Sequence, residues 1–273
     1  MCELFCLSSR QPTVATFSLE RFAARGGLAG HTIDGWGLAL YDDADLRLYR
    51  EPEPARDSRW LQFVQGRRLP SRLLISHIRH ATRGGVRLAN TQPFAREIGG
   101  RMHVFAHNGR LEPLLQPGAP RPRRFRPIGD TDSEVAACLL FDAMAGLWDA
   151  GTEPPLGRRV MLVSDFAASL RPLGPANFLY SDGHHVYAHG HRRTQAEGRI
   201  APPGLWLLRR ECAADADALP QAGLSLDTGS GPQQVVLLAS VPLTDEPWRP
   251  LGEGELVVAA NGTLLEASRG QPA

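Results

Sequence analysis

The segment Met1-Cys2-Glu3-Leu4-Phe5-Cys6-Leu7 opens the chain, and it is typical of a β-strand with a cysteine directly behind the first methionine. If Met1 is removed, Cys2 becomes the first residue, and its thiol then lies beside a free α-amine. Such an amine has a pKa of about 8, so at neutral pH part of it can accept a proton. One residue would supply both nucleophile and base, as N-terminal threonine nucleophiles do. The alternative is that Cys2 is a small apolar residue of a buried strand.

The charge balance of the chain excludes several classes of function. The 273 residues carry 30 lysines and arginines against 29 acidic residues, so the net charge is +1. The chain therefore lacks the excess of positive charge that is typical of proteins that bind nucleic acid or an anionic membrane. All 30 of these basic residues are arginines, which excludes Schiff-base, P-loop and kinase-type lysine chemistry.

At about 150 residues per domain the length allows one or two domains. We expect a single domain over 1–273, with the mature chain beginning at residue 2.

Cysteine usage predicts a reducing compartment. The four cysteines are Cys2, Cys6, Cys138 and Cys212. They form no CxxC pair and no zinc spacing. There is no secretory signal, and no uncharged apolar stretch approaches 18 residues. We therefore expect a cytoplasmic protein with free thiols, without cofactor or metal. His185, His189 and His191 could share a strand face, but no carboxylate or cysteine joins them at a metal-binding spacing.

Strand patterns occur early and late in the chain, and most helix patterns lie between them. The predicted strands are 4–7, 35–41, 46–49, 73–78, 102–106, 177–180, 186–188, 235–239, 255–260 and 263–265. The predicted helices are 19–24, 134–147 with its start at Asp132-Ser133, and 156–170. The proline- and arginine-rich segment 117–127 is expected to be an irregular loop with a solvated basic surface. This order indicates an α+β layered domain rather than alternating βαβ units.

The segment Ala106-His107-Asn108-Gly109 ends a predicted strand with two hydrogen-bond donors. Asn108 has a side-chain amide, and Gly109 has a backbone N–H that no side chain obstructs. Two such donors can form an oxyanion hole. The alternative is an ordinary Asn-Gly hairpin turn.

Two charged residues at other predicted element ends could hold the two charges of an amino acid. Arg79 lies in His77-Ile78-Arg79-His80, where a strand runs into a glycine-rich loop. Its guanidinium could bind a carboxylate through two parallel hydrogen bonds, or it could form a surface ion pair. Asp132 could bind an ammonium group, or it could cap the helix that begins there.

Five motifs in this order resemble a known family, and the likeness covers nearly the whole chain. They are Met1-Cys2, His77-x-Arg79-x-x-Thr82, Asn90-Thr91-x-Pro93-Phe94, His107-Asn108-Gly109 and Thr131-Asp132-Ser133-Glu134. Each motif is weak singly, but the ordered set is specific. The sequence resembles the class II glutamine amidotransferases, which are N-terminal nucleophile hydrolases, and within them the stand-alone, YafJ-type branch.

The resemblance implies a four-layer αββα sandwich with the active site at one end of its two sheets. It implies roles for six residues: Cys2 as the catalytic nucleophile, Asn108 and Gly109 as the oxyanion pair, and Arg79, Thr82 and Asp132 as substrate-binding residues. Arg79 would hold the α-carboxylate and Asp132 the α-amine. Two positions depart from the pattern, since Arg83 and Gln92 stand where several biosynthetic relatives carry histidine. Both are expected at the pocket wall and its lid.

Three functional hypotheses follow from the resemblance. The first is a stand-alone amidohydrolase that cleaves the side-chain amide of glutamine or of a γ-glutamyl compound through a γ-glutamyl thioester. The second is an ammonia-supplying glutaminase subunit that docks on a separate synthase. The third is a non-catalytic protein that binds a glutamine-like ligand. A homodimer is compatible with each, and none requires nucleic acid or a membrane.

Overall fold

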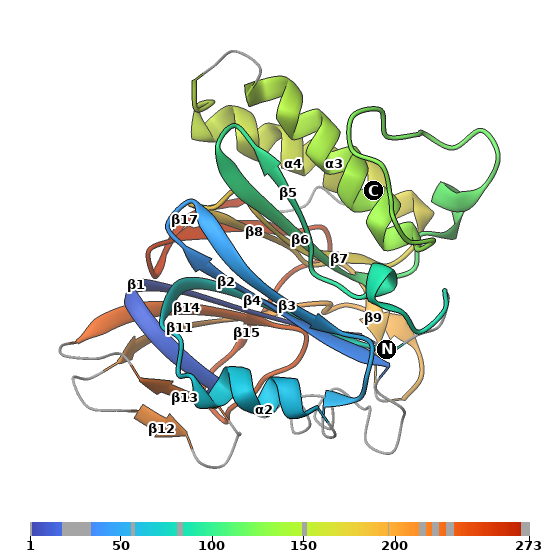
Figure 1. Cartoon of the computed structure of the whole chain (residues 1–273). Helices are drawn as coiled ribbons and strands as arrows, with labels where there is room; N and C mark the ends of the chain where they lie inside the picture. The colour runs from blue at the N-terminus through green and yellow to red at the C-terminus, as the bar shows by residue number, and fades with distance from the viewer. Residues whose placement is uncertain are drawn as a thin grey trace.

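Two antiparallel sheets lie face to face and carry helices on their outer faces (Figure 1). The computed structural model describes residues 2–17, 34–55, 58–80, 84–148, 152–195, 197–212, 217–219, 224–227 and 232–268. Within these residues the first sheet has nine strands and the second has six. The predicted α+β class and the four-layer αββα sandwich are both confirmed.

The first sheet follows the order β15-β11-β14-β1-β4-β2-β3, and β13 pairs with both β1 and β12. Its strands are β1 (Glu3–Phe17), β2 (Gly35–Asp42), β3 (Asp45–Glu51), β4 (Ser71–Arg79), β11 (Trp206–Cys212), β12 (Asp217–Leu219), β13 (Leu224–Asp227), β14 (Gln233–Ala239) and β15 (Arg249–Pro250). The first strand thus lies inside the sheet, between β14 and β4, so its start is held from both sides.

The second sheet follows the order β17-β16-β8-β7-β6-β5. Its strands are β5 (Phe94–Ile98), β6 (Arg101–Gly109), β7 (Ala176–Ser181), β8 (Val186–His189), β16 (Leu256–Ala260) and β17 (Thr263–Ser268). A separate two-stranded ribbon consists of β9 (Arg193–Thr194) and β10 (Ile200–Ala201). The helices are α2 (Arg59–Gly66), α3 (Asp132–Trp148) and α4 (Leu156–Leu170), with 3₁₀ turns η3 (Leu88–Asn90), η4 (Glu112–Leu115) and η5 (Arg171–Leu173).

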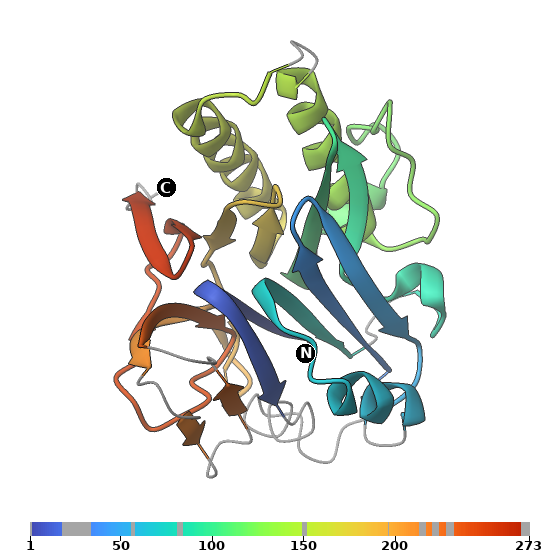
Figure 2. The same ribbon diagram turned by 60° about the vertical axis from the view of Figure 1, so that its left-hand side comes forward.

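Alternation along the strands builds three apolar layers. Successive side chains of a strand point to opposite faces of its sheet. In β1, Leu4 and Cys6 pack between the two sheets, whereas Phe5 and Leu7 pack on the outer face with residues of α2. In β6, Ala106 belongs to the core between the sheets. The outer face of the second sheet packs against α3 and α4, as both views show (Figures 1 and 2).

Most predicted elements are confirmed, with ends that extend a few residues further. The helix predicted over 156–170 coincides with α4, and the one predicted from Asp132 coincides with α3. The predicted helix 19–24 lies outside the described residues. The sequence missed α2, β5 and β11, among others. The helix α2 has only eight residues, and its large apolar residues Trp60 and Phe63 are exposed. No helix in the described part of the chain combines the length and apolar character needed to cross a bilayer.

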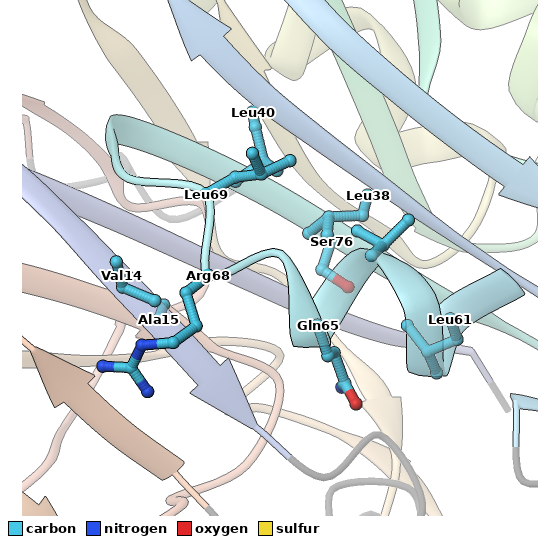
Figure 3. A pocket seen from close by; sticks show the side chains of 10 residues that line it. Val14, Ala15, Leu38, Leu40, Leu61, Gln65, Arg68, Leu69 and Ser76 are labelled. Atoms are coloured by element: carbon cyan, nitrogen blue, oxygen red, sulfur yellow. The ribbon is translucent and has the colours of Figure 1, made fainter.

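A small cavity lies between α2 and the outer face of the first sheet (Figure 3). Its space of about 20 Å³ is enough for one water molecule. Leu38 and Leu40 of β2 and Leu61 of α2 line it together with Ser76 of β4, whose buried hydroxyl has no hydrogen-bond partner within the described residues. Because these side chains point away from the second sheet, the cavity is a packing feature separate from the face that carries Leu4 and Cys6.

Candidate active site

Strand alternation brings three of the sequence-predicted residues to one end of the space between the sheets. Cys2 continues the inward-facing series of Leu4 and Cys6 in β1. Arg79 ends β4 on the face of Leu73 and Ile75, and Asn108 ends β6 on the face of Val104 and Ala106. The three residues therefore converge from both sheets, although they are distant in sequence.

Cys2 has direct contacts with both sheets. The Asn108 side-chain amide donates to the backbone oxygen of Cys2 at 2.5 Å. The Cys2 Sγ atom lies 3.5 Å from the backbone oxygen of His80 and accepts from its N–H at 3.4 Å. His80 directly follows Arg79 at the end of β4, so the thiol of Cys2 contacts the residue next to Arg79, while its backbone contacts the predicted oxyanion residue Asn108.

The thiol of Cys2 needs a base to become a nucleophile. Burial raises its pKa, and the His80 N–H, the positive amino terminus and Arg79 oppose this effect only in part. A thiol with a raised pKa stays protonated at neutral pH, and the thiolate is the reactive form. A proton acceptor beside Cys2 is therefore required, and its own α-amine would fill that role once Met1 is removed.

Arg79 is buried and does not lie on the surface. Its side chain is only 4% exposed, and Nη2 donates to the backbone oxygen of Gly84 at 3.2 Å. Burial lowers its pKa, and the acidic groups of Cys2, Asp34 and Asp130, when ionised, act in the opposite direction. A buried cation at the mouth of the site is well suited to an anionic substrate group, because low polarity strengthens their attraction.

Asn108 and Gly109 end a strand and do not form a hairpin turn. The chain continues into η4, and β6 pairs with β5 and β7, neither of which follows Gly109 directly. The alternative of an Asn-Gly hairpin is therefore wrong. The pairing of β6 with β7 is a long-range contact, which the local turn pattern cannot reveal.

The backbone of Gly109 is oriented by its neighbours. Gly109 lies opposite Ala176 of β7, and the N–H of Arg110 donates to the Pro175 oxygen at 3.1 Å. Because neighbouring N–H groups of a strand point to opposite edges, the N–H of Gly109 points away from β7. A side chain at position 109 would collide with the carbonyl oxygen of Pro175. Glycine is thus required for this close approach of β6 to Pro175.

Asp132 does not cap α3. The cap is Thr131, whose hydroxyl accepts from the N–H of Glu134 at 3.2 Å. The Asp132 carboxylate instead accepts from the N–H of Leu111 at 2.5 Å and from that of Ser133 at 2.8 Å. The first contact ties the start of α3 to Leu111, two residues beyond the predicted oxyanion pair.

The remaining predicted pocket residues differ in outcome. Thr82 and Arg83 lie outside the described residues. Gln92 is buried, and its side-chain amide accepts from the His107 N–H at 2.7 Å and donates to the His107 oxygen at 3.2 Å. The expectation that Gln92 lies at the pocket wall or its lid stays a prediction. It braces β6 directly before Asn108, in the way that a neighbouring strand would.

The three histidines of the metal hypothesis do not converge. His185 lies 3.4 Å from Asp182, whereas His189 bonds the backbone oxygen of Ala176 at the other end of β8. His191 lies beyond that strand and 3.4 Å from Glu253. Among the residues that the structure describes, no group of three or more His, Cys, Asp or Glu side chains could hold a metal ion.

A hollow of about 690 Å³ lies remote from Cys2, between the β2–β3, β7–β8 and β16–β17 turns. Those turns are at the opposite end of the strands from Arg79 and Gly109. The chemistry of the site is therefore indicated by side-chain convergence and not by the size of a pocket.

The sequence patterns missed a buried ionic group directly behind the site. Glu3 and Arg193 are both buried, with Nη2 of Arg193 2.8 Å from a Glu3 carboxylate oxygen. The one available signal was an acidic residue between Cys2 and Leu4, inside an otherwise apolar strand.

Comparison with known proteins finds relatives that match nearly the whole chain. The family model for class II glutamine amidotransferases matches residues 1–272. YafJ of Escherichia coli K12, which is named as a glutamine amidotransferase, is 34% identical over 93% of this chain and 96% of its own. A Haemophilus influenzae protein named in the same way is 30% identical, over 100% of this chain and 88% of its own.

Solved structures show the same fold. A crystal structure from Pseudomonas aeruginosa, described as that of a predicted glutamine amidotransferase, aligns with a TM-score of 0.71 and 31% identity, over 97% of this chain and 100% of that chain. The Bacillus subtilis glutamine phosphoribosylpyrophosphate amidotransferase aligns with a TM-score of 0.54 and 15% identity, over 98% of this chain and 49% of that chain. The second likeness shows the fold alone.

Proposed function

Since the chain belongs to the class II glutamine amidotransferases, an enzyme family with an N-terminal nucleophile, we propose that it hydrolyses the side-chain amide of glutamine or of a γ-glutamyl compound. The observation that carries the proposal is the contact of 2.5 Å between the Asn108 amide and the backbone of Cys2. It joins the proposed nucleophile to the proposed oxyanion donor across the two sheets.

The chemistry runs in two halves. Cys2 Sγ attacks the amide carbon while its thiol proton passes to the α-amine of the same residue. The amine then returns that proton to the leaving nitrogen, and ammonia or an amine departs from a γ-glutamyl thioester. Water, deprotonated by the amine, attacks the thioester and releases glutamate and the thiol. Asn108 Nδ2 and the Gly109 N–H would hold the negative oxygen that develops in both halves.

The charged groups at the site support an α-amino acid head group as the recognition element. A guanidinium such as that of Arg79 offers donors in a fork that matches a carboxylate. Asp132 has two backbone N–H contacts, but a carboxylate has about four lone-pair sites and can still accept from an ammonium group. We propose that Arg79 binds the α-carboxylate, that Asp132 binds the α-amine, and that residues 1–273 act as one domain.

Intact-mass spectrometry with a glutamine-mimicking diazo ketone tests the proposal. We expect the mature mass to lack Met1 and to gain a single adduct on Cys2. The D-enantiomer of the reagent is the matched control, and it should react much more slowly because Arg79 and Asp132 would face the wrong groups. Retention of Met1, or labelling of another residue, would contradict the proposal.

Replacing Arg79 with lysine should weaken substrate binding. The lysine keeps the positive charge but loses the bidentate fork, and a charged hydrogen bond contributes about 1.5–3 kcal/mol. We therefore expect KM for glutamine or a γ-glutamyl amide to rise about 10- to 100-fold, with kcat changed much less. Arg72→Lys is the control, since Arg72 is an exposed residue at the other end of β4. Equal KM values for the two variants would refute the role of Arg79.

A second candidate function, an ammonia-supplying subunit, is favoured by one surface. Four exposed arginines lie within six residues of the loop before Asp132: Arg121, Arg123, Arg124 and Arg126. The Asp142 carboxylate holds the backbone of this loop at Arg124 and Phe125, with contacts of 3.1 and 2.8 Å. A fixed basic surface suits an acidic face of a synthase. The kcat of the isolated protein separates the candidates, since a stand-alone enzyme should reach about 1 s⁻¹ or more.

A further inference from the structure

A buried ion pair lies directly behind the proposed nucleophile. Glu3 is 0% exposed and Arg193 is 4% exposed. Nη2 of Arg193 lies 2.8 Å from a Glu3 oxygen, and Nη1 donates to the backbone oxygen of Ser240 at 2.6 Å. Glu3 belongs to β1, Arg193 to β9, and Ser240 directly follows β14, so one guanidinium joins three segments beside the start of β1.

Ser240 extends this connection to both catalytic groups. Its backbone N–H donates to the Leu4 oxygen at 3.0 Å, and its hydroxyl accepts from the Leu4 N–H at 2.9 Å. The same hydroxyl lies 3.4 Å from Nδ2 of Asn108, the atom that also contacts the backbone of Cys2. A continuous chain of contacts thus runs from the ion pair to the proposed oxyanion donor.

A second connection reaches Asn108 from the same segment. Nδ2 of Asn177 donates to the Asn108 oxygen at 3.0 Å and to the Arg192 oxygen at 2.6 Å. Its Oδ1 atom accepts from the N–H of His191 at 2.7 Å. Residues 191–193 are therefore connected by hydrogen bonds to β6 at Asn108, through Asn177, and to β1 at Glu3, next to Cys2.

The energetic cost of the pair indicates a role beyond stability. Removing two charges from water costs several kcal/mol per ion, and well-packed apolar residues often replace such a pair without loss of stability. Burial raises the pKa of Glu3 to about 7, which reflects the same cost, although Arg193 opposes it. Glu3 points to the opposite face of the strand from Cys2, so it can act on the thiol only through the backbone and the charge field.

We infer that Glu3 and Arg193 are positioning residues, which hold the Cys2 backbone and the Asn108 amide in the geometry that attack requires. The inference rests on the proposed function. A displacement of about 1 Å in a catalytic group can lower the rate about 10²-fold. Loss of the pair should therefore lower kcat, while KM, which depends on Arg79 and Asp132, should change little.

The test compares two buried ion pairs in the full-length enzyme. Arg193→Met should lower kcat about 10²-fold with KM within about 3-fold of wild type, and Arg193→Lys should restore part of kcat because it can still pair with Glu3. The matched control is Arg159→Met. Arg159 is similarly buried and lies 2.7 Å from Asp182, but at the opposite end of the sandwich. Arg159→Met should lower thermal stability, while the kcat of the folded variant stays within about 3-fold of wild type.

Ser240→Ala keeps the test decisive if Arg193→Met fails to fold, because it removes only a hydroxyl. We expect its kcat to fall about 10-fold. The inference is overturned if both Arg193→Met and Ser240→Ala have the kcat of wild type. If Arg193→Met cannot be purified, a wild-type kcat of Ser240→Ala is sufficient to overturn it. Wild-type enzyme that turns over neither glutamine nor a γ-glutamyl amide would overturn the proposed function, and this inference with it.

Discussion

Replacement of Cys2 with alanine is expected to abolish amide hydrolysis. No other group in the described part of the site offers a thiol, and the γ-glutamyl thioester cannot form without one. Loss of a nucleophile lowers kcat by as much as about 10⁶-fold in a well-studied hydrolase. We therefore expect a decrease of at least about 10³-fold for glutamine and γ-glutamyl amides, measured by glutamate release. The diazo-ketone adduct should disappear as well.

Cys6→Ala is the matched control for this variant. Cys6 lies four residues further along β1, faces the same core and is fully buried. It also has a pKa far above the usual thiol value because of burial, so it stays protonated. Its replacement should cost some stability and leave kcat within about 2-fold. Substantial turnover by Cys2→Ala, with Met1 removed as in wild type, would rule out Cys2 as the nucleophile.

Replacement of Asn108 with alanine is expected to have the second largest effect. It removes one of two proposed donors to the oxyanion, a change that costs about 2.7–4 kcal/mol in the transition state. We expect kcat to fall about 10²- to 10³-fold. KM should stay within a few-fold, because the head group would still be bound by Arg79 and Asp132. The measurement is steady-state hydrolysis of a γ-glutamyl amide with a spectroscopically detectable amine.

Two controls separate this effect from damage to the nucleophile. Alkylation of Cys2 by iodoacetamide requires no oxyanion hole, so it should persist in Asn108→Ala. Asn261→Gly changes an exposed asparagine in the turn after β16, where the φ angle of 49° suits glycine. Its kcat should equal that of wild type. If the kcat of Asn108→Ala lies within about 3-fold of wild type, Asn108 is not an oxyanion donor.

Local apolar patterns in the sequence were sufficient to predict most of the strands and the two long helices. Apolar runs predicted most strands of both sheets, though not β5 or β11, and the spacing near 3.6 predicted α3 and α4 with almost their observed ends. These elements have long, regular apolar patterns, which are the strongest signals in a sequence. The eight-residue helix α2 gave no such signal, since only Leu61 and Val64 of its residues are buried.

The ordered motifs also predicted the candidate site residues. Their detailed roles were less accessible. Thr131, not Asp132, caps α3, so the alternative role of Asp132 as a helix cap is wrong. The hydrogen bonds between Gln92 and His107 were not predicted. Both observations have one cause: a polar side chain at an element end has several available partners, and the packing of other segments decides among them.

The sequence alone determined the face on which each strand residue lies, and thereby that Cys2, Arg79 and Asn108 can point inward, because side-chain direction follows from the period of two within a strand. Tertiary structure alone decided that these residues meet, and that Arg193 reaches Glu3 across 190 positions. Pairing between distant strands depends on the packing of the whole sandwich, and no local pattern encodes a contact of that range.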